Sequence, residues 1–158
     1  MGVDRSLKTG IAAPKFRLKA LGGGMNSLDE YLAKGPVLLI FFKGACPTCQ
    51  FTLPYFERMK NGKVQLLAIS QDDAESTAEF HDSFRVSLET LLDDEDNGYP
   101  VSNAYRITNV PTMFMIGNDG LIGQVTIGFV KRDMEAIGVQ CGIAPFRSGD
   151  YVPEWKAG

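Results

Sequence analysis

The sequence is poor in cysteine, histidine and tryptophan, and these shortages exclude several classes of protein. Its 158 residues include three cysteines, one histidine and one tryptophan. Three cysteines are too few for the disulfide framework of a small secreted domain. A structural zinc site commonly takes two cysteine pairs, or one pair with two histidines. Besides Cys46 and Cys49, the chain has only one further cysteine, Cys141, and one histidine, His81. Neither set of zinc ligands can be completed, so we expect no metal.

The chain also lacks an excess of positive charge and a long apolar run. Its net charge is -3 and its isoelectric point is about 5.2, whereas nucleic-acid binders usually carry a basic patch. The longest apolar run, residues 36–42, is far too short to span a bilayer, and the first ten residues are polar. We expect no nucleic-acid partner and, by default, a cytoplasmic protein. A periplasmic or membrane-tethered protein would need a signal outside this sequence.

The pattern of apolar residues predicts a single α/β domain. A composition of 44% hydrophobic and 22% charged residues suits one core that needs no disulfide staples. Short apolar runs bounded by glycine, proline or asparagine predict strands, and amphipathic stretches between them predict helices. The predicted strands are 15–21, 36–42, 64–70 and a hairpin over 112–128, and the predicted helices are 27–35, 47–60, 73–84, 99–105 and 131–141. This order predicts a central mixed sheet with helices on both faces.

Two acidic segments carry more local signals. Asp72 and Glu75 have the spacing of a capping box at the start of the 73–84 helix. The segment 93–98 begins like a calcium-binding loop, but Ala104 stands where the last carboxylate ligand is due. We therefore predict an acidic, solvated turn there.

The cysteine pair Cys46 and Cys49 follows the most apolar predicted strand and begins a predicted helix. Ligands of such sheets bind at the carboxyl ends of the parallel strands. Gln50 stands where haem attachment needs a histidine, and a C-x-x-C motif beside a βαβ pattern favours redox chemistry over two core cysteines. The unpaired N–H groups of a helix start stabilise a thiolate at Cys46. We predict that Cys46 attacks and Cys49 resolves, and that Cys141 is a structural cysteine.

Three segments give the chain a more specific resemblance. It resembles the thioredoxin superfamily and, within it, the TlpA/ResA-like thiol–disulfide oxidoreductases, which are related to the AhpC/TSA peroxiredoxin-like group. The similarity runs from Thr9 to Cys141. The segments are "TGIAAPKFRL" (9–18), "FFKGACPTCQFTLPYFERM" (41–59) and "LLDDEDNGYPVSNAYRITNVPTMFMIGNDGLI" (91–122).

The resemblance implies a thioredoxin-like fold with an N-terminal extension. The similarity ends at Cys141, so we expect a domain over residues 1–142 and a tail over 143–158. The tail carries Phe146, Tyr151 and Trp155 among polar residues, and it either docks on the domain or reaches a partner. Pro111 would be the family's cis-proline next to the sulfur atoms. Val110 would then offer backbone groups to an extended substrate, as in β-strand addition.

Several positions around the motif depart from the family pattern. Ala45 stands where relatives usually have tryptophan, so the substrate-contacting surface that it forms with Pro47 should be more open. Thr52 replaces a glutamate that many relatives carry, which removes a carboxylate base. Lys43 replaces a small residue; its ammonium group either lowers a thiol pKa or points to solvent, and both alternatives stay open.

These observations predict a thiol–disulfide oxidoreductase that acts on protein disulfides or small thiols. It would need no cofactor, and an electron-donor thiol system would reduce it again. The alternative is a peroxiredoxin-like, antioxidant thiol peroxidase. Counted back from Cys49, however, Phe42 and Cys46 replace the proline and threonine of the peroxiredoxin motif.

Overall fold

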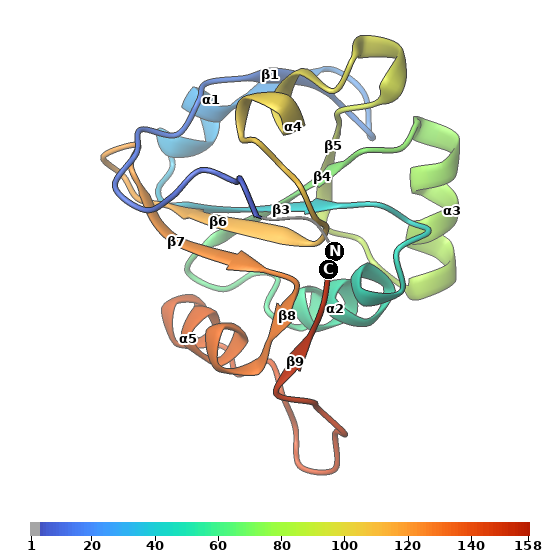
Figure 1. Ribbon diagram of the computed structural model, residues 1–158, viewed down its shortest axis with the longest axis vertical. Coiled ribbons are helices and arrows are strands. Elements are labelled where there is room, and N and C mark those ends of the chain that lie inside the picture. The colour runs from blue at the N-terminus through green and yellow to red at the C-terminus, as the bar shows by residue number, and fades with distance from the viewer. Residues whose placement is uncertain (1–3) are drawn as a thin grey trace.

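A seven-stranded mixed β-sheet forms the centre of the computed structural model, which describes residues 4–158 (Figure 1). The strand order is β2-β1-β5-β4-β3-β6-β7. Strands β3, β4 and β5 are mutually parallel, whereas β1, β2, β6 and β7 pair antiparallel with their neighbours. The strands are β1 (Arg17–Ala20), β2 (Met25–Ser27), β3 (Val37–Phe42), β4 (Gln65–Ser70), β5 (Glu89–Leu92), β6 (Thr112–Ile116) and β7 (Ile122–Ile127).

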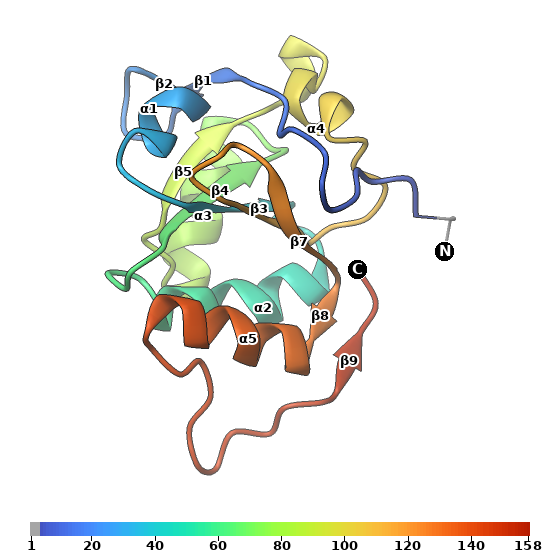
Figure 2. The same cartoon turned by 90° about the vertical axis from the view of Figure 1, so that its left-hand side faces the viewer.

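Helices cover both faces of this sheet, as Figure 2 shows from the side. Helices α2, α3 and α5 cover one face, and their apolar side chains form one core cluster with that face. Helices α1 and α4 cover the other face and contribute to a second core cluster. The helices are α1 (Leu28–Leu32), α2 (Pro47–Arg58), α3 (Ala74–Phe84), α4 (Pro100–Ala104) and α5 (Lys131–Cys141), with a 3-10 turn, η1, at Glu95–Asn97. The predicted thioredoxin-like α/β class is confirmed.

The central strand β3 shows why the apolar run 36–42 forms a strand buried on both faces. All six residues from Val37 to Phe42 are buried. Successive side chains of a strand point to opposite faces, so Leu38, Ile40 and Phe42 enter the core beneath α2, while Val37, Leu39 and Phe41 enter the core beneath α4. Both layers are thereby anchored to one strand.

The start of α3 lies one residue from the predicted capping box. The N-cap is Asp73, whose carboxylate accepts a hydrogen bond from the Ser76 N–H at 2.8 Å. Asp72, the predicted cap, instead accepts from the Gly44 N–H at 2.8 Å. Either aspartate could cap the helix by its local chemistry. The bond from Gly44, 28 residues away in sequence, engages Asp72 and leaves Asp73 as the cap. Asp72 thus holds the loop that leads to the cysteine pair.

The prediction of a solvated turn over 93–98 is wrong at its first residue. Asp93 is fully buried, whereas Glu95 and Asp96 are exposed. The Asp93 carboxylate accepts hydrogen bonds from the N–H groups of Val101 at 3.0 Å and Ser102 at 2.6 Å. It therefore satisfies the free N–H groups at the start of α4, a contact that no local spacing indicated.

Substituting Asp93 with alanine is expected to lower the free energy of unfolding by about 1–3 kcal/mol, because two buried N–H groups lose their acceptor. Urea unfolding followed by circular dichroism measures the change. The matched control is Asp96→Ala in the same loop, which should stay within about 0.5 kcal/mol of the parent. Equal stability of the two variants would contradict this role for Asp93.

The segment after α5 folds back along the molecule. It extends beyond α5 and returns to place β9 (Trp155–Lys156) antiparallel to β8 (Phe129–Val130), as both views show (Figures 1 and 2). The guanidinium group of Arg58 on α2 donates to Asp150 at 2.7 Å and to the carbonyl of Pro145 at 3.0 Å. The division at residue 142 stays a prediction, but the segment contacts α2. Between residues 4 and 158, no helix combines the length and apolar character needed to cross a membrane.

Candidate active site

Cys46 is the N-cap residue of α2. Its sulfur accepts a hydrogen bond from the Cys49 N–H at 3.2 Å, and Pro47 occupies the first helical position, where its missing N–H costs nothing. The Cys46 N–H is itself bonded to the Lys43 carbonyl at 3.3 Å. Both cysteines are free thiols, so the structure represents the reduced form of the pair.

The two thiols have opposite properties. Cys46 is half-buried, whereas Cys49 is fully buried. A hydrogen bond from the Cys49 thiol and the N–H groups of Cys49 and Thr48 lower the pKa of Cys46 to about 6, against the opposing effect of partial burial. Burial, and then the adjacent Cys46 sulfur, raise the pKa of Cys49. At neutral pH the pair therefore comprises one thiolate and one thiol.

The loop before β6 brings a backbone carbonyl to the nucleophile. The Val110–Pro111 peptide bond is cis, and the Cys46 sulfur lies 3.4 Å from the Val110 carbonyl oxygen, to which it donates a hydrogen bond only when it is protonated. Pro111 is buried and Val110 is half-buried. The fold thus joins two segments 64 residues apart in one site. Thr112 fixes this loop by donating from its hydroxyl to the Asn109 carbonyl at 2.6 Å.

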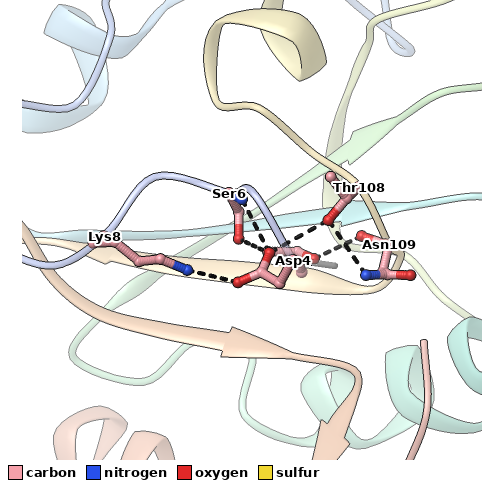
Figure 3. A network of polar contacts seen from close by, with 6 residues as sticks. Asp4, Ser6, Lys8, Thr108 and Asn109 are labelled. Atoms are coloured by element: carbon pink, nitrogen blue, oxygen red, sulfur yellow. Dashed lines mark hydrogen bonds and ion pairs between the residues drawn. The ribbon is translucent and has the colours of Figure 1, made fainter. Parts of the chain in front are cut away.

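The N-terminal segment supports the same loop through a network of polar contacts (Figure 3). The carboxylate of Asp4 accepts hydrogen bonds from Ser6, from Lys8 at 2.7 Å and from the Thr108 hydroxyl at 3.3 Å. Asn109 donates in turn to Thr108 at 3.3 Å. Partial burial opposes ionisation, but the bonds from Lys8 and Ser6 lower the pKa of Asp4 to about 2. Asp4 is therefore a carboxylate that ties the N-terminal segment to this loop.

Of the other predicted site residues, two flank Cys46 in the sequence and one lines a neighbouring cavity. Ala45 and Pro47 are exposed on either side of it. Lys43 lines a polar cavity of about 320 Å³ next to the acidic side chains of Asp72 and Asp94. The contacts that lower the Cys46 pKa come from Cys49 and Thr48. An effect of Lys43 on the thiolate, one of its two alternatives, stays a prediction.

Thr52 occupies the place of the missing glutamate. It is fully buried, and its hydroxyl donates to the Thr48 carbonyl at 2.6 Å. Cys141 is also buried, on α5, where burial raises its pKa. Within residues 4–158, no three His, Cys, Asp or Glu side chains are grouped closely enough to hold a metal ion.

Sequence reasoning missed one contact at the site. The Thr48 hydroxyl, between the two cysteines, donates to the carbonyl of Ala157 at 2.6 Å. The Lys156 ammonium lies 5.4 Å from the ring centre of Phe51, one turn further along α2. The aromatic residues of the tail, Phe146, Tyr151 and Trp155, are the only sequence signal for packing on the domain, and they do not indicate the place of contact.

A thioredoxin-like sheet with a C-x-x-C pair at a helix start defines the chain as a thiol–disulfide oxidoreductase. Residues 9–125 match the AhpC/TSA family, and the chain belongs to that family. The thiol-disulfide oxidoreductase ResA of Geobacillus kaustophilus is 30% identical over 82% of this chain and 76% of its own length. The ResA of Halalkalibacterium halodurans is 32% identical over 83% of this chain and 76% of its own length.

Solved structures agree with this fold. The thioredoxin domain of a thiol–disulfide oxidoreductase from Bacteroides vulgatus superposes with a TM-score of 0.70 at 22% identity, covering 78% of this chain and 91% of that domain. The peroxidoxin BcpB of Mycobacterium tuberculosis superposes with a TM-score of 0.64 at 22% identity, covering 76% of this chain and 85% of its own. Thiol–disulfide oxidoreductases and peroxidoxins therefore share this fold, so only the residues of the site can distinguish the two activities.

Proposed function

We propose that Cys46 attacks a substrate disulfide and that Cys49 resolves the product. The Cys46 thiolate forms a bond to one substrate sulfur, and the other substrate sulfur leaves as a thiolate that takes up a proton. Cys49, losing its proton, then attacks Cys46 and releases the second substrate thiol. The substrate gains two electrons, and the pair becomes a disulfide. The carrying observation is a half-buried thiol with a lowered pKa hydrogen-bonded to a buried one with a raised pKa.

The surroundings of Cys46 support a protein or small-thiol substrate. Ala45 and Pro47 leave its outer side open, and Val110 presents its carbonyl beside the sulfur. Because strand addition uses such backbone groups, we propose that Val110 and Pro111 form the edge on which an extended substrate lies. A donor thiol system must then reduce the pair again.

The direction of exchange depends on the potential of the pair against that of its compartment. In a reducing cytoplasm the pair would be kept as a dithiol and act as a reductant. In an oxidising periplasm it would need a dedicated donor to do the same. Equilibrating the protein with glutathione measures this potential.

A peroxidase is less well supported by the geometry. A peroxiredoxin-like thiol would occupy the position of Cys49, and it must ionise and meet peroxide. Cys49 is fully buried with a raised pKa. The lowered pKa belongs to Cys46, where the peroxiredoxin motif has threonine.

The pH dependence of thiol alkylation tests the assignment of the nucleophile. Protonation removes the thiolate below the pKa, so the rate of reaction of the reduced protein with iodoacetamide should rise through about pH 6 and then level off. Below that point the rate should fall about tenfold per pH unit. Mass spectrometry should locate the label on Cys46. A single step near the ordinary thiol value of 9.0, or a first label on Cys49, would refute it.

A further inference from the structure

The last four residues, Trp155 to Gly158, form a segment that we call the C-terminal strap. Its first two residues pair with β8, Trp155 opposite Val130 and Lys156 opposite Phe129. The strand pairing directs the strap along β8 toward the start of α2, as both views show (Figures 1 and 2). The strap therefore approaches the cysteine pair from the side of β8.

The end of the strap contacts both halves of the site. The Ala157 carbonyl accepts the hydrogen bond from Thr48, inside the C-x-x-C motif. A Cβ atom added to Gly158 would lie only 2.7 Å from the Val110 carbonyl oxygen and 3.1 Å from its carbon. The backbone of Gly158 is therefore in close contact with the carbonyl next to the Cys46 sulfur.

We propose that the C-terminal strap determines which disulfides reach Cys46, by covering the edge of Val110 that a polypeptide substrate needs. The inference rests on the proposed role of Val110. An extended chain and Gly158 cannot both lie against one carbonyl, so a protein disulfide reacts only after the strap moves away. A small disulfide needs no such edge and reaches Cys46 past Ala45 and Pro47, which are exposed.

The contacts of the strap suit a cover that detaches. Its ladder with β8 is only two residues long, and Trp155 is 57% exposed. Segments with few buried apolar contacts open at a small fraction of the global free energy of unfolding. The strap also passes close to Gly128, where an added Cβ would lie 2.5 Å from the Lys156 carbonyl oxygen, so a side chain at position 128 would collide with the strap.

The substitution Gly158→Val tests the proposal in the full chain without changing a residue of the cysteine motif. Its side chain would collide with the Val110 carbonyl and displace the end of the strap. If the open form is a minor population, freeing it should raise the rate of insulin reduction about fivefold, while the rate with hydroxyethyl disulfide stays unchanged. The matched control is Gly22→Val, since an added Cβ at Gly22 meets nothing within 4 Å. It should leave both rates unchanged.

The position of the strap can be followed independently. Trp155 is the single tryptophan of the chain, so its fluorescence reports the strap alone, and trypsin cleavage after Lys156 reports its release. A second variant, Thr48→Val with Gly158→Val, also removes the hydrogen bond to Ala157. Insulin rates equal to the parent's in both variants would overturn the proposal. Failure of the parent to reduce hydroxyethyl disulfide would instead refute the proposed role of the cysteines.

Discussion

Cys46→Ser should abolish the reduction of protein disulfides and the formation of mixed disulfides together. Serine keeps the size of the side chain but has no nucleophilic thiolate, and Cys49 is fully buried with a raised pKa. Cys49→Ser should also abolish turnover, but it should still attack substrate and remain linked to it. Insulin reduction measures turnover, and mass spectrometry without reductant detects the trapped complex.

Cys141→Ser is the matched control for this pair, because Cys141 is a buried cysteine on another helix. Its turnover should be close to that of the parent. Loss of most turnover in Cys141→Ser would show that this residue relays electrons. A covalent complex trapped by Cys46→Ser rather than by Cys49→Ser would reverse the assigned roles.

Tyr105→Ala is expected to lower the free energy of unfolding by about 3–5 kcal/mol, because it removes a fully buried ring and leaves a cavity. Tyr105 has no exposed surface. Its ring centre lies 5.4 Å from that of Phe41 and 5.2 Å from that of Phe114, and its hydroxyl donates to the Pro14 carbonyl at 2.7 Å. Urea unfolding measures the loss.

The control Tyr105→Phe keeps the ring and removes only the hydroxyl, so it should cost about 0.5–1.5 kcal/mol. Tyr105 belongs to the core on the face of the sheet opposite α2. The folded fraction of either variant should therefore keep the alkylation profile of Cys46. Equal losses of stability in Tyr105→Ala and Tyr105→Phe would show that the hydrogen bond, not the ring, dominates.

Elements with a complete local pattern could be predicted from the sequence. The continuous apolar run of β3 and the two apolar runs that a turn joins in the hairpin of β6 and β7 each carry a strand signal within their own residues. By contrast, β5 has four residues, Glu89–Leu92, and it forms because β4 and β1 pair with it on either side. The two-residue strands β8 and β9 likewise exist only through each other.

The candidate site divides in the same way. The position of Cys46 at a helix start predicts its stabilised thiolate, since the free N–H groups there are local features of the helix. The burial of Cys49 depends on packing in the core beneath α2. Placing Val110 beside Cys46 required a family resemblance. The bond from Thr48 to Ala157 joins residues 109 positions apart, and no periodicity or spacing encodes it.

The position of β3 also sets how different parts of the site exchange their amide hydrogens. Every residue of β3 pairs with β4, and Val37–Phe41 pair with β6 on the other side. Amides protected in this way exchange with solvent only when the whole domain opens, whereas those of a two-residue ladder exchange through small local fluctuations. We therefore expect Cys46 to follow the most strongly protected strand, while Thr48 two residues later contacts a segment with little protection. Hydrogen exchange would then show a fixed attacking sulfur beside a segment that opens and closes.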